Sequence, residues 1–127
     1  MRPIPDFSDS ELWIVETTLR ERYGRKVPYE LAESDIRLRS SDRELTPCPI
    51  VYWEDGDCHL VVIKTGEKAY RNMFFYRVHQ QYGTGVPEYD DLTECVVSLL
   101  QAQADHERER RREEDETTGD ESKTDSK

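Results

Sequence analysis

Residues 67–82, EKAYRNMFFYRVHQQY, decide the fold, because the structure assigned to them fixes how many strands and helices the chain has. The stretch runs between Gly66 and Gly83 and contains neither glycine nor proline. Strands rarely run that long, so the length favours a helix, although the aromatic residues favour a strand. We predict a helix. A strand would instead direct Phe74, Tyr76 and Val78 to one face and Phe75, Arg77 and His79 to the other.

As a helix, this aromatic segment carries large apolar groups on two opposite faces. Such a helix must be covered on both sides, by its own domain or by a partner. Tyrosine is large, rigid and amphipathic, and it is enriched where proteins contact one another. We therefore predict a binding surface on one face of the segment and at its end, made by Asn72, Phe75, Tyr76, His79 and Tyr82.

Residues 49–64, PIVYWEDGDCHLVVIK, predict a β-hairpin before the aromatic segment. The Asp-Gly dipeptide at 55–56 suits a two-residue type I′ turn, in which both positions need a positive φ. Both strands are apolar at nearly every residue, so they belong at the centre of a sheet or in a sheet covered on both faces. The predicted register pairs Trp53 with Cys58, Tyr52 with His59, Val51 with Leu60 and Glu54 with Asp57.

Helix and strand signals flank this hairpin on both sides. Ser8 and Glu11 form a predicted capping box, and the helix that they start ends at Gly24, a left-handed stop. After Pro28, alternating apolar and charged residues predict a half-buried strand. After Asp91, apolar residues recur at i, i+3, i+4, i+7 and i+8, which is typical of an amphipathic helix.

Together these elements predict an α+β fold. An N-terminal helix precedes a three-stranded antiparallel sheet, and two helices follow it. Residues 1–104 form a single domain in this interpretation. Residues 105–127 contain no apolar residue, and their first part has both favourable and repulsive charge pairs, so we expect a charged helical extension that frays into a disordered acidic tail.

The charge of the chain narrows the classes of partner. Acidic residues outnumber basic ones by 28 to 18, which gives the 127 residues a formal net charge of −10. Binding to nucleic acid or to an anionic membrane surface is therefore disfavoured, since both need a net-basic face. The N-terminus lacks the apolar core of a signal peptide, and no run approaches membrane-spanning length. We expect a cytoplasmic protein.

Cysteine, histidine and glycine patterns give little support to a metal or cofactor site. Cys48, Cys58, His59 and Cys95 are suitable zinc ligands, but no CxxC loop brings two of them together. The hairpin also sends Cys58 and His59 to opposite faces. The GxG at 83–85 is followed by aspartates rather than by a basic residue, so it does not favour a phosphate site. We expect no cofactor and buried cysteines.

Two functions follow from these patterns. The favoured one is a small acidic accessory or adaptor protein that acts by protein–protein binding, a chaperone-like role included, without catalytic activity. Its partner is another protein, or a second copy in a homodimer. The alternative is a small enzyme or ligand-binding domain with an acid–base cleft around Tyr76, Arg77 and His79, because tyrosine and histidine can exchange protons and arginine can orient a carboxylate.

Overall fold

The N-terminal helix, α1 (Asp9–Tyr23), begins and ends where the sequence signals place it. The Ser8 hydroxyl accepts a hydrogen bond from the Glu11 amide, and the Glu11 carboxylate accepts one from the Ser8 amide, so two amides at the helix start are satisfied. At the other end Gly24 has a φ of 70°, and its amide donates to the Arg20 carbonyl. The predicted capping box and left-handed stop are both confirmed.

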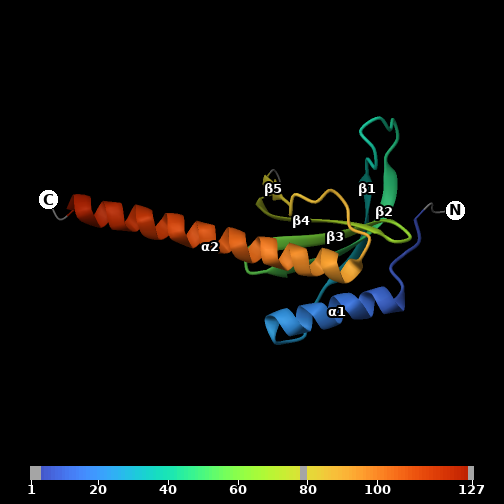
Figure 1. The fold of residues 1–127 in the computed structure, drawn as a ribbon, viewed down its shortest axis with the longest axis horizontal. Helices are drawn as coiled ribbons and strands as arrows, with labels where there is room; N and C mark the ends of the chain where they lie inside the picture. Colours follow the sequence, from blue (N-terminus) through green and yellow to red (C-terminus); the bar gives the residue numbers. More distant parts are fainter. Residues whose placement is uncertain (1–3, 78–79, 126–127) are drawn as a thin grey trace.

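Five antiparallel strands form one sheet in which the spatial order follows the chain order, and a long helix follows the last strand (Figure 1). The structure is a computed structural model that describes residues 4–77 and 80–125, with side chains to residue 113 except that of Gln80. After α1, the elements are β1 (Glu30–Ile36), β2 (Thr46–Asp55), β3 (Cys58–Gly66), β4 (Ala69–Arg77), β5 (Gln80–Tyr82) and α2 (Leu92–Asp125).

Within the aromatic segment 67–82, residues 69–77 form β4 and residues 80–82 form β5, so the helix predicted for the segment is wrong. The length of the segment favoured a helix only if the segment was a single element, whereas it contains two shorter strands that pair antiparallel. β3 supplies the physical reason: it is buried along most of its length, and a buried strand needs hydrogen-bonding partners on both edges. β2 pairs with one edge and β4 with the other. The sheet thus has five strands rather than three, and one helix rather than two follows it.

The hairpin between β2 and β3 forms with a register different from the predicted one. Asp55 pairs with Cys58, so the turn residues are Gly56 and Asp57 rather than the Asp-Gly dipeptide. Gly56 has a φ of 60° while no residue other than glycine has a positive φ in the described chain, which matches a type II′ turn. Each pair shifts by two residues, so every side chain keeps its predicted face of the sheet. Glu54 consequently faces His59 instead of Asp57.

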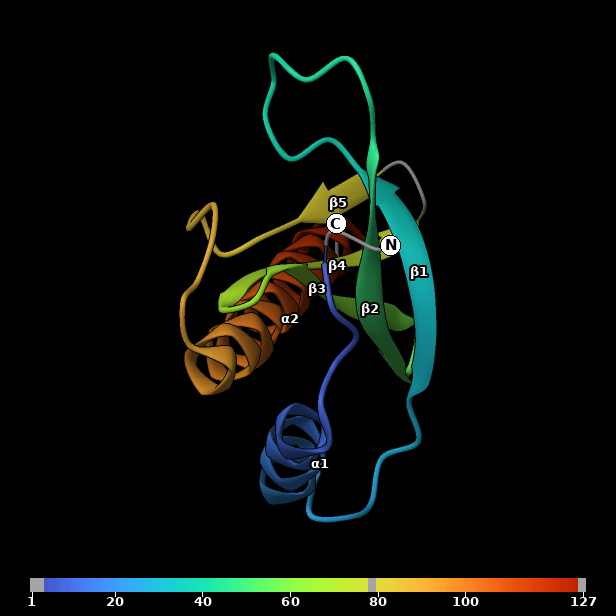
Figure 2. The same cartoon turned by 90° about the vertical axis from the view of Figure 1, so that its right-hand side faces the viewer.

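Both helices lie on one face of the sheet and enclose the main core with it (Figure 2). The α2 stripe predicted from the sequence is buried there: Leu92, Cys95, Val96, Leu99 and Leu100. The Asp91 carboxylate accepts a hydrogen bond from the Glu94 amide and caps the start of this helix. The opposite face of the sheet carries a second apolar cluster around Cys48, Val61 and Ile63.

The C-terminal helix runs well past the sheet (Figure 1). Arg110 still contacts the hairpin turn, since one guanidinium nitrogen lies 3.9 Å from the Asp57 carboxylate. The predicted domain boundary at residue 104 and the disordered tail within 105–127 stay predictions.

A buried polar network joins the start of α1 to the sheet. The Lys64 ammonium lies 2.7 Å from the Glu11 carboxylate and donates to the Asp6 carbonyl as well, and the Tyr70 hydroxyl donates to the second Glu11 oxygen. Burial alone raises the pKa of Glu11, but the hydrogen bonds from Lys64 and Tyr70 outweigh it, so this pKa lies below its ordinary value of 4.5. The carboxylate is therefore held in its ionised form.

Replacing Lys64 by methionine tests this network. Lys64→Met keeps the length of the side chain but leaves the Glu11 carboxylate buried without its cation, and we expect a loss of about 3 kcal/mol in the free energy of unfolding. Urea denaturation measures the loss. Lys68→Met, at an exposed lysine of the following turn, is the matched control and should change stability little. Equal losses in the two variants would contradict the network.

The lowered pKa of Glu11 also predicts how stability depends on pH. The folded state holds this proton less tightly than the unfolded state, so the stabilisation is complete above about pH 4.5 and is lost as the pH falls through the lowered pKa. We expect the free energy of unfolding to fall less steeply in Glu11→Gln than in the unmodified protein below about pH 4.5. Urea titrations at a series of pH values measure both slopes, with Glu21→Gln as the exposed control. Parallel curves would show that Glu11 is not the group responsible.

Candidate functional site

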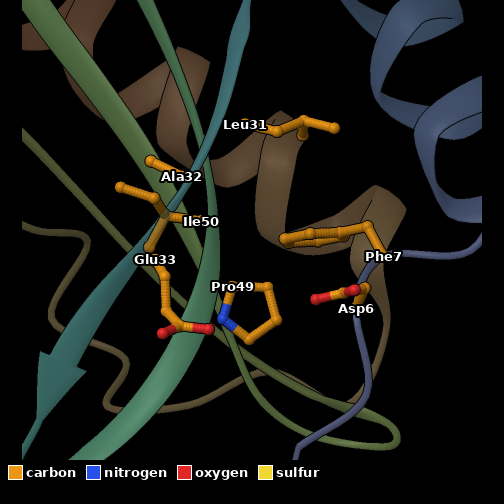
Figure 3. Close-up of a pocket in the computed structure, with 7 residues that line it drawn as sticks. All are labelled: Asp6, Phe7, Leu31, Ala32, Glu33, Pro49 and Ile50. Carbon is orange, nitrogen blue, oxygen red and sulfur yellow. The ribbon is translucent and has the colours of Figure 1, made fainter.

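A slot of about 510 Å³ lies between the segment that precedes α1 and the strands β1 and β2 (Figure 3). The segment contributes Phe7 and Asp6, and the strands contribute Leu31 and Pro49 from the side that faces them. Phe7 is buried in the main core, whereas Leu31 is 56% exposed. The slot therefore has an apolar floor with two carboxylates, Asp6 and Glu33, at its sides.

The alternation of β1 explains why a leucine is exposed at this point. Leu31 pairs with Val51, and Val51 belongs to the main core on the helix side of the sheet. Leu31 points to that same side but lies one strand further out, where the helices leave it uncovered. The neighbouring Ala32 pairs with Ile50 and points to the opposite face. An apolar residue thus occupies the charged side of an alternating strand.

β1 is one edge of the sheet. Within the part of the chain that the structure describes, it pairs with β2 and no other strand lies beyond it. All seven of its residues are at least partly exposed, which is unusual for a strand that contributes to a core. An exposed edge strand is a template for pairing with another chain, and natural proteins commonly protect such edges with charge. Here the charges are acidic: Glu30, Glu33 and Asp35.

A second hollow, of about 330 Å³, lies beside the first residues of β1. Its aromatic walls include Tyr29 and Tyr52, and each phenol donates a hydrogen bond of 2.6 Å to a glutamate, Glu16 and Glu54 respectively. The hydrogen bond to Glu16 raises the pKa of Tyr29 to about 12. Burial, followed by the hydrogen bond to Glu54, raises the pKa of Tyr52 to about 12. Both phenols therefore stay protonated, and two carboxylates, Glu30 and Glu54, line this hollow.

Tyr52 also belongs to an aromatic stack on the face of the sheet opposite the helices. His59 lies between Tyr52 and Phe75, with ring centroids 5.8 Å and 4.9 Å away respectively. The Tyr52 hydroxyl contacts Nδ1 of His59, and the Glu54 carboxylate lies 3.4 Å from the same nitrogen. The stack holds Tyr52 in place at the rim of the second hollow.

The five residues predicted to form a binding surface do not share one face. The Asn72 amide donates to the Cys95 carbonyl of α2 at 2.8 Å, and Tyr76 and Tyr82 stack on His106 of the same helix. Phe75 lies on the opposite face of the sheet. His79 lies outside the described residues. As neighbours on a strand alternate between faces, the helical face that would have united these residues does not exist.

The described residues of the predicted acid–base cleft, Tyr76 and Arg77, differ in their surroundings. Burial and a hydrogen bond to Glu107 raise the pKa of Tyr76, and the Arg110 guanidinium lies over its ring, 4.3 Å from the centroid. Tyr76 is thus packed against α2. Arg77 is exposed, and it lies at the end of β4, where the register against β5 shifts between Phe75 and Arg77. The third member, His79, lies outside the described residues.

The cysteines predicted as weak metal candidates are all buried and unpaired. Cys58 lies in the main core, whereas Cys48 lies in the cluster on the other face, on the side to which His59 points. Burial raises the pKa of Cys58 to about 11 and that of Cys95 to about 12, so both thiols stay protonated. Among the described residues, no group of three histidine, cysteine, aspartate or glutamate side chains is placed to hold a metal ion.

Comparisons of the chain with known protein families, with curated proteins and with solved structures find no match. In the described part of the chain, neither helix is both long enough and apolar enough to cross a membrane. Sequence reasoning missed the slot, although one signal was present: Leu31 is the apolar residue on the charged side of the alternating strand.

The contact of His106 with three aromatic rings predicts how β5 is held. His106→Ala removes the ring that packs on Phe74, Tyr76 and Tyr82, and we expect a loss of about 1 kcal/mol in the free energy of unfolding. We also expect faster amide hydrogen exchange in β5. Arg108→Ala, an exposed position of the same helix, is the control. Unchanged exchange in β5 would show that α2 does not hold this strand through His106.

Proposed function

We propose that this protein is a small accessory or adaptor protein that binds a partner protein along the outer edge of β1, with the adjoining slot receiving an apolar side chain. One observation carries the proposal. Leu31 stands exposed on an edge strand, directly beside a slot floored by Phe7 and Pro49. A chaperone-like role is one form of the same activity, because an edge strand can hold an extended segment of another chain.

The edge and the slot support binding through different interactions. A strand added to β1 would gain main-chain hydrogen bonds, which give affinity without selecting a sequence. The slot would bury apolar surface at about 25 cal/mol per Å² and would select a side chain by its size and shape. Main-chain pairing and a side-chain pocket together make up a known mode of peptide recognition.

A different protein is a better partner for this edge than a second copy of the chain. If two β1 edges paired antiparallel, the acidic residues Glu30, Glu33 and Asp35 would all lie at one junction with the same residues of the other copy. Like charges on neighbouring strands are destabilising. The unpaired cysteines are compatible with the reducing cytoplasm that we propose as the location.

The alternative function, an enzyme with an acid–base cleft, has weaker support. Tyr76 is packed against α2, and Arg77 is exposed at the end of β4. The two hollows beside β1 are lined by other residues. We therefore prefer the adaptor.

Site-specific photocrosslinking tests the proposed function. A photoreactive phenylalanine analogue is placed at Leu31, and the protein is irradiated in its native cells. We expect a discrete adduct with one or a few proteins, because a partner strand on β1 would cover this side chain. Mass spectrometry identifies the adduct and the joined peptides.

The matched control places the same analogue at Val97, which is also about half exposed but lies on α2. This position should give no comparable adduct. Adducts of equal yield from both positions, or none from Leu31, would sink the proposal. Adducts between two copies of the chain would replace the adaptor with a homodimer.

A further inference from the structure

The two hollows lie at successive positions of the same strand. Residues 31–33 line the slot, and Pro28, Tyr29 and Glu30 line the tyrosine–glutamate hollow. Strand residues rise about 3.3 Å each, so residues 30 and 33 are about 10 Å apart. A single extended segment that follows β1 would therefore reach both hollows with side chains only a few residues apart.

The tyrosine–glutamate hollow has the chemistry of a cation site. Glu30 and Glu54 line it, and Glu16 accepts the hydrogen bond from the Tyr29 phenol at its side. Tyr52 adds an aromatic ring, and rings attract cations through their faces. Arg25 and Lys26 precede the hollow in the chain, but neither lines it. An ammonium or guanidinium group would be attracted here, and a carboxylate would be repelled.

The slot has a complementary preference. Phe7, Leu31 and Pro49 offer apolar contacts, and the exposure of Leu31 leaves room for a side chain to cover it. Asp6 and Glu33 line its sides, so a carboxylate would be repelled here too, whereas an apolar side chain would cover Phe7, Leu31 and Pro49.

We infer that the segment received by this edge is an extended, cationic stretch of a partner protein, which places a lysine or arginine in the tyrosine–glutamate hollow and a nearby apolar residue in the slot. This inference rests on the proposed function and adds the chemistry of the partner. An acidic segment is excluded by the glutamates of the hollow. An amphipathic helix is disfavoured, because it offers no main-chain partners to an edge strand.

Labelled synthetic peptides test the inference directly on the full chain. The probe has seven residues, the length of β1, and alternates lysine with valine. A glutamate–valine peptide tests the sign of the charge, and a lysine–serine peptide tests the need for an apolar residue. A lysine–valine peptide with N-methylated main-chain amides tests strand pairing, since it has lost donors. Fluorescence anisotropy near physiological ionic strength should detect binding of the unmodified lysine–valine peptide alone.

Matched variants distinguish the groove from general attraction to an acidic molecule. The double variant Glu30→Gln, Glu54→Gln should weaken binding by about tenfold, whereas Glu21→Gln, Glu44→Gln, at exposed positions elsewhere, should not. Leu31→Asn should also weaken binding by about tenfold, and Leu45→Asn, with similar exposure, should not. Equal losses within either comparison would overturn the inference, and so would equal binding of the N-methylated peptide.

The two proposals fail in different ways. If Leu31 gives partner adducts in cells but the lysine–valine peptide does not bind, the cationic segment is wrong while the adaptor function stands. If the peptide binds at β1 but no adduct forms in cells, the groove has the inferred preference while its use in partner binding is wrong.

Discussion

The structure depends on a strand that is buried on both faces and paired on both edges. β3 has side chains in the main core and in the cluster on the opposite face, and it lies at the centre of the sheet order. A strand buried on both faces requires a neighbouring strand on each edge and apolar cover on each face. Here a helical layer covers one face and an apolar cluster covers the other. β2 and β4 pair with its two edges, and α1 and α2 cover one of its faces. In the described part of the chain, the acidic strand β1 is an edge of this sheet and pairs only with β2.

One buried lysine on this strand also sets the position of the first helix. Lys64 is 4% exposed, and its cation is neutralised by Glu11, the residue that closes the capping box of α1. The same carboxylate therefore serves the helix start and the sheet. Because Asp6 accepts from Lys64 through its carbonyl, the network also holds the segment that forms one wall of the slot. The buried contacts of Lys64 therefore help to fix the wall of the slot.

Local signals allowed much of this fold to be predicted from the sequence. The capping box at Ser8, the stop at Gly24 and the apolar stripe of α2 depend on residues a few positions apart, and each lies where the pattern places it. The aromatic segment depends instead on pairing with β3, and length is a poor guide when the chain reverses within a segment. A stretch with equal helix and strand tendency takes the structure that its neighbours require.

The candidate site was harder to predict, for a related reason. Side chains such as Asn72 and Tyr76 looked available because their cover, α2, comes from the far end of the chain. Conversely, Leu31 looked like one apolar residue among charges, and its exposure follows from the position of β1 at the edge of the sheet. Burial and exposure are properties of the assembled layers. A period in the sequence indicates the face of a side chain but not whether anything covers that face.

The hairpin turn carries a consequence of its own. The observed alignment and the one expected from Asp55-Gly56 place the same side chains in the same layers, so apolar burial does not distinguish them. Gly56 has a positive φ in both alignments, so they differ at Asp55, which needs a positive φ in the expected type I′ turn and has none here. Evolutionary selection at this turn would therefore act on the alignment of β2 with β3 rather than on the packing of the core. The backbone preference of one turn residue can thus carry structural information that the hydrophobic pattern of the whole chain does not contain.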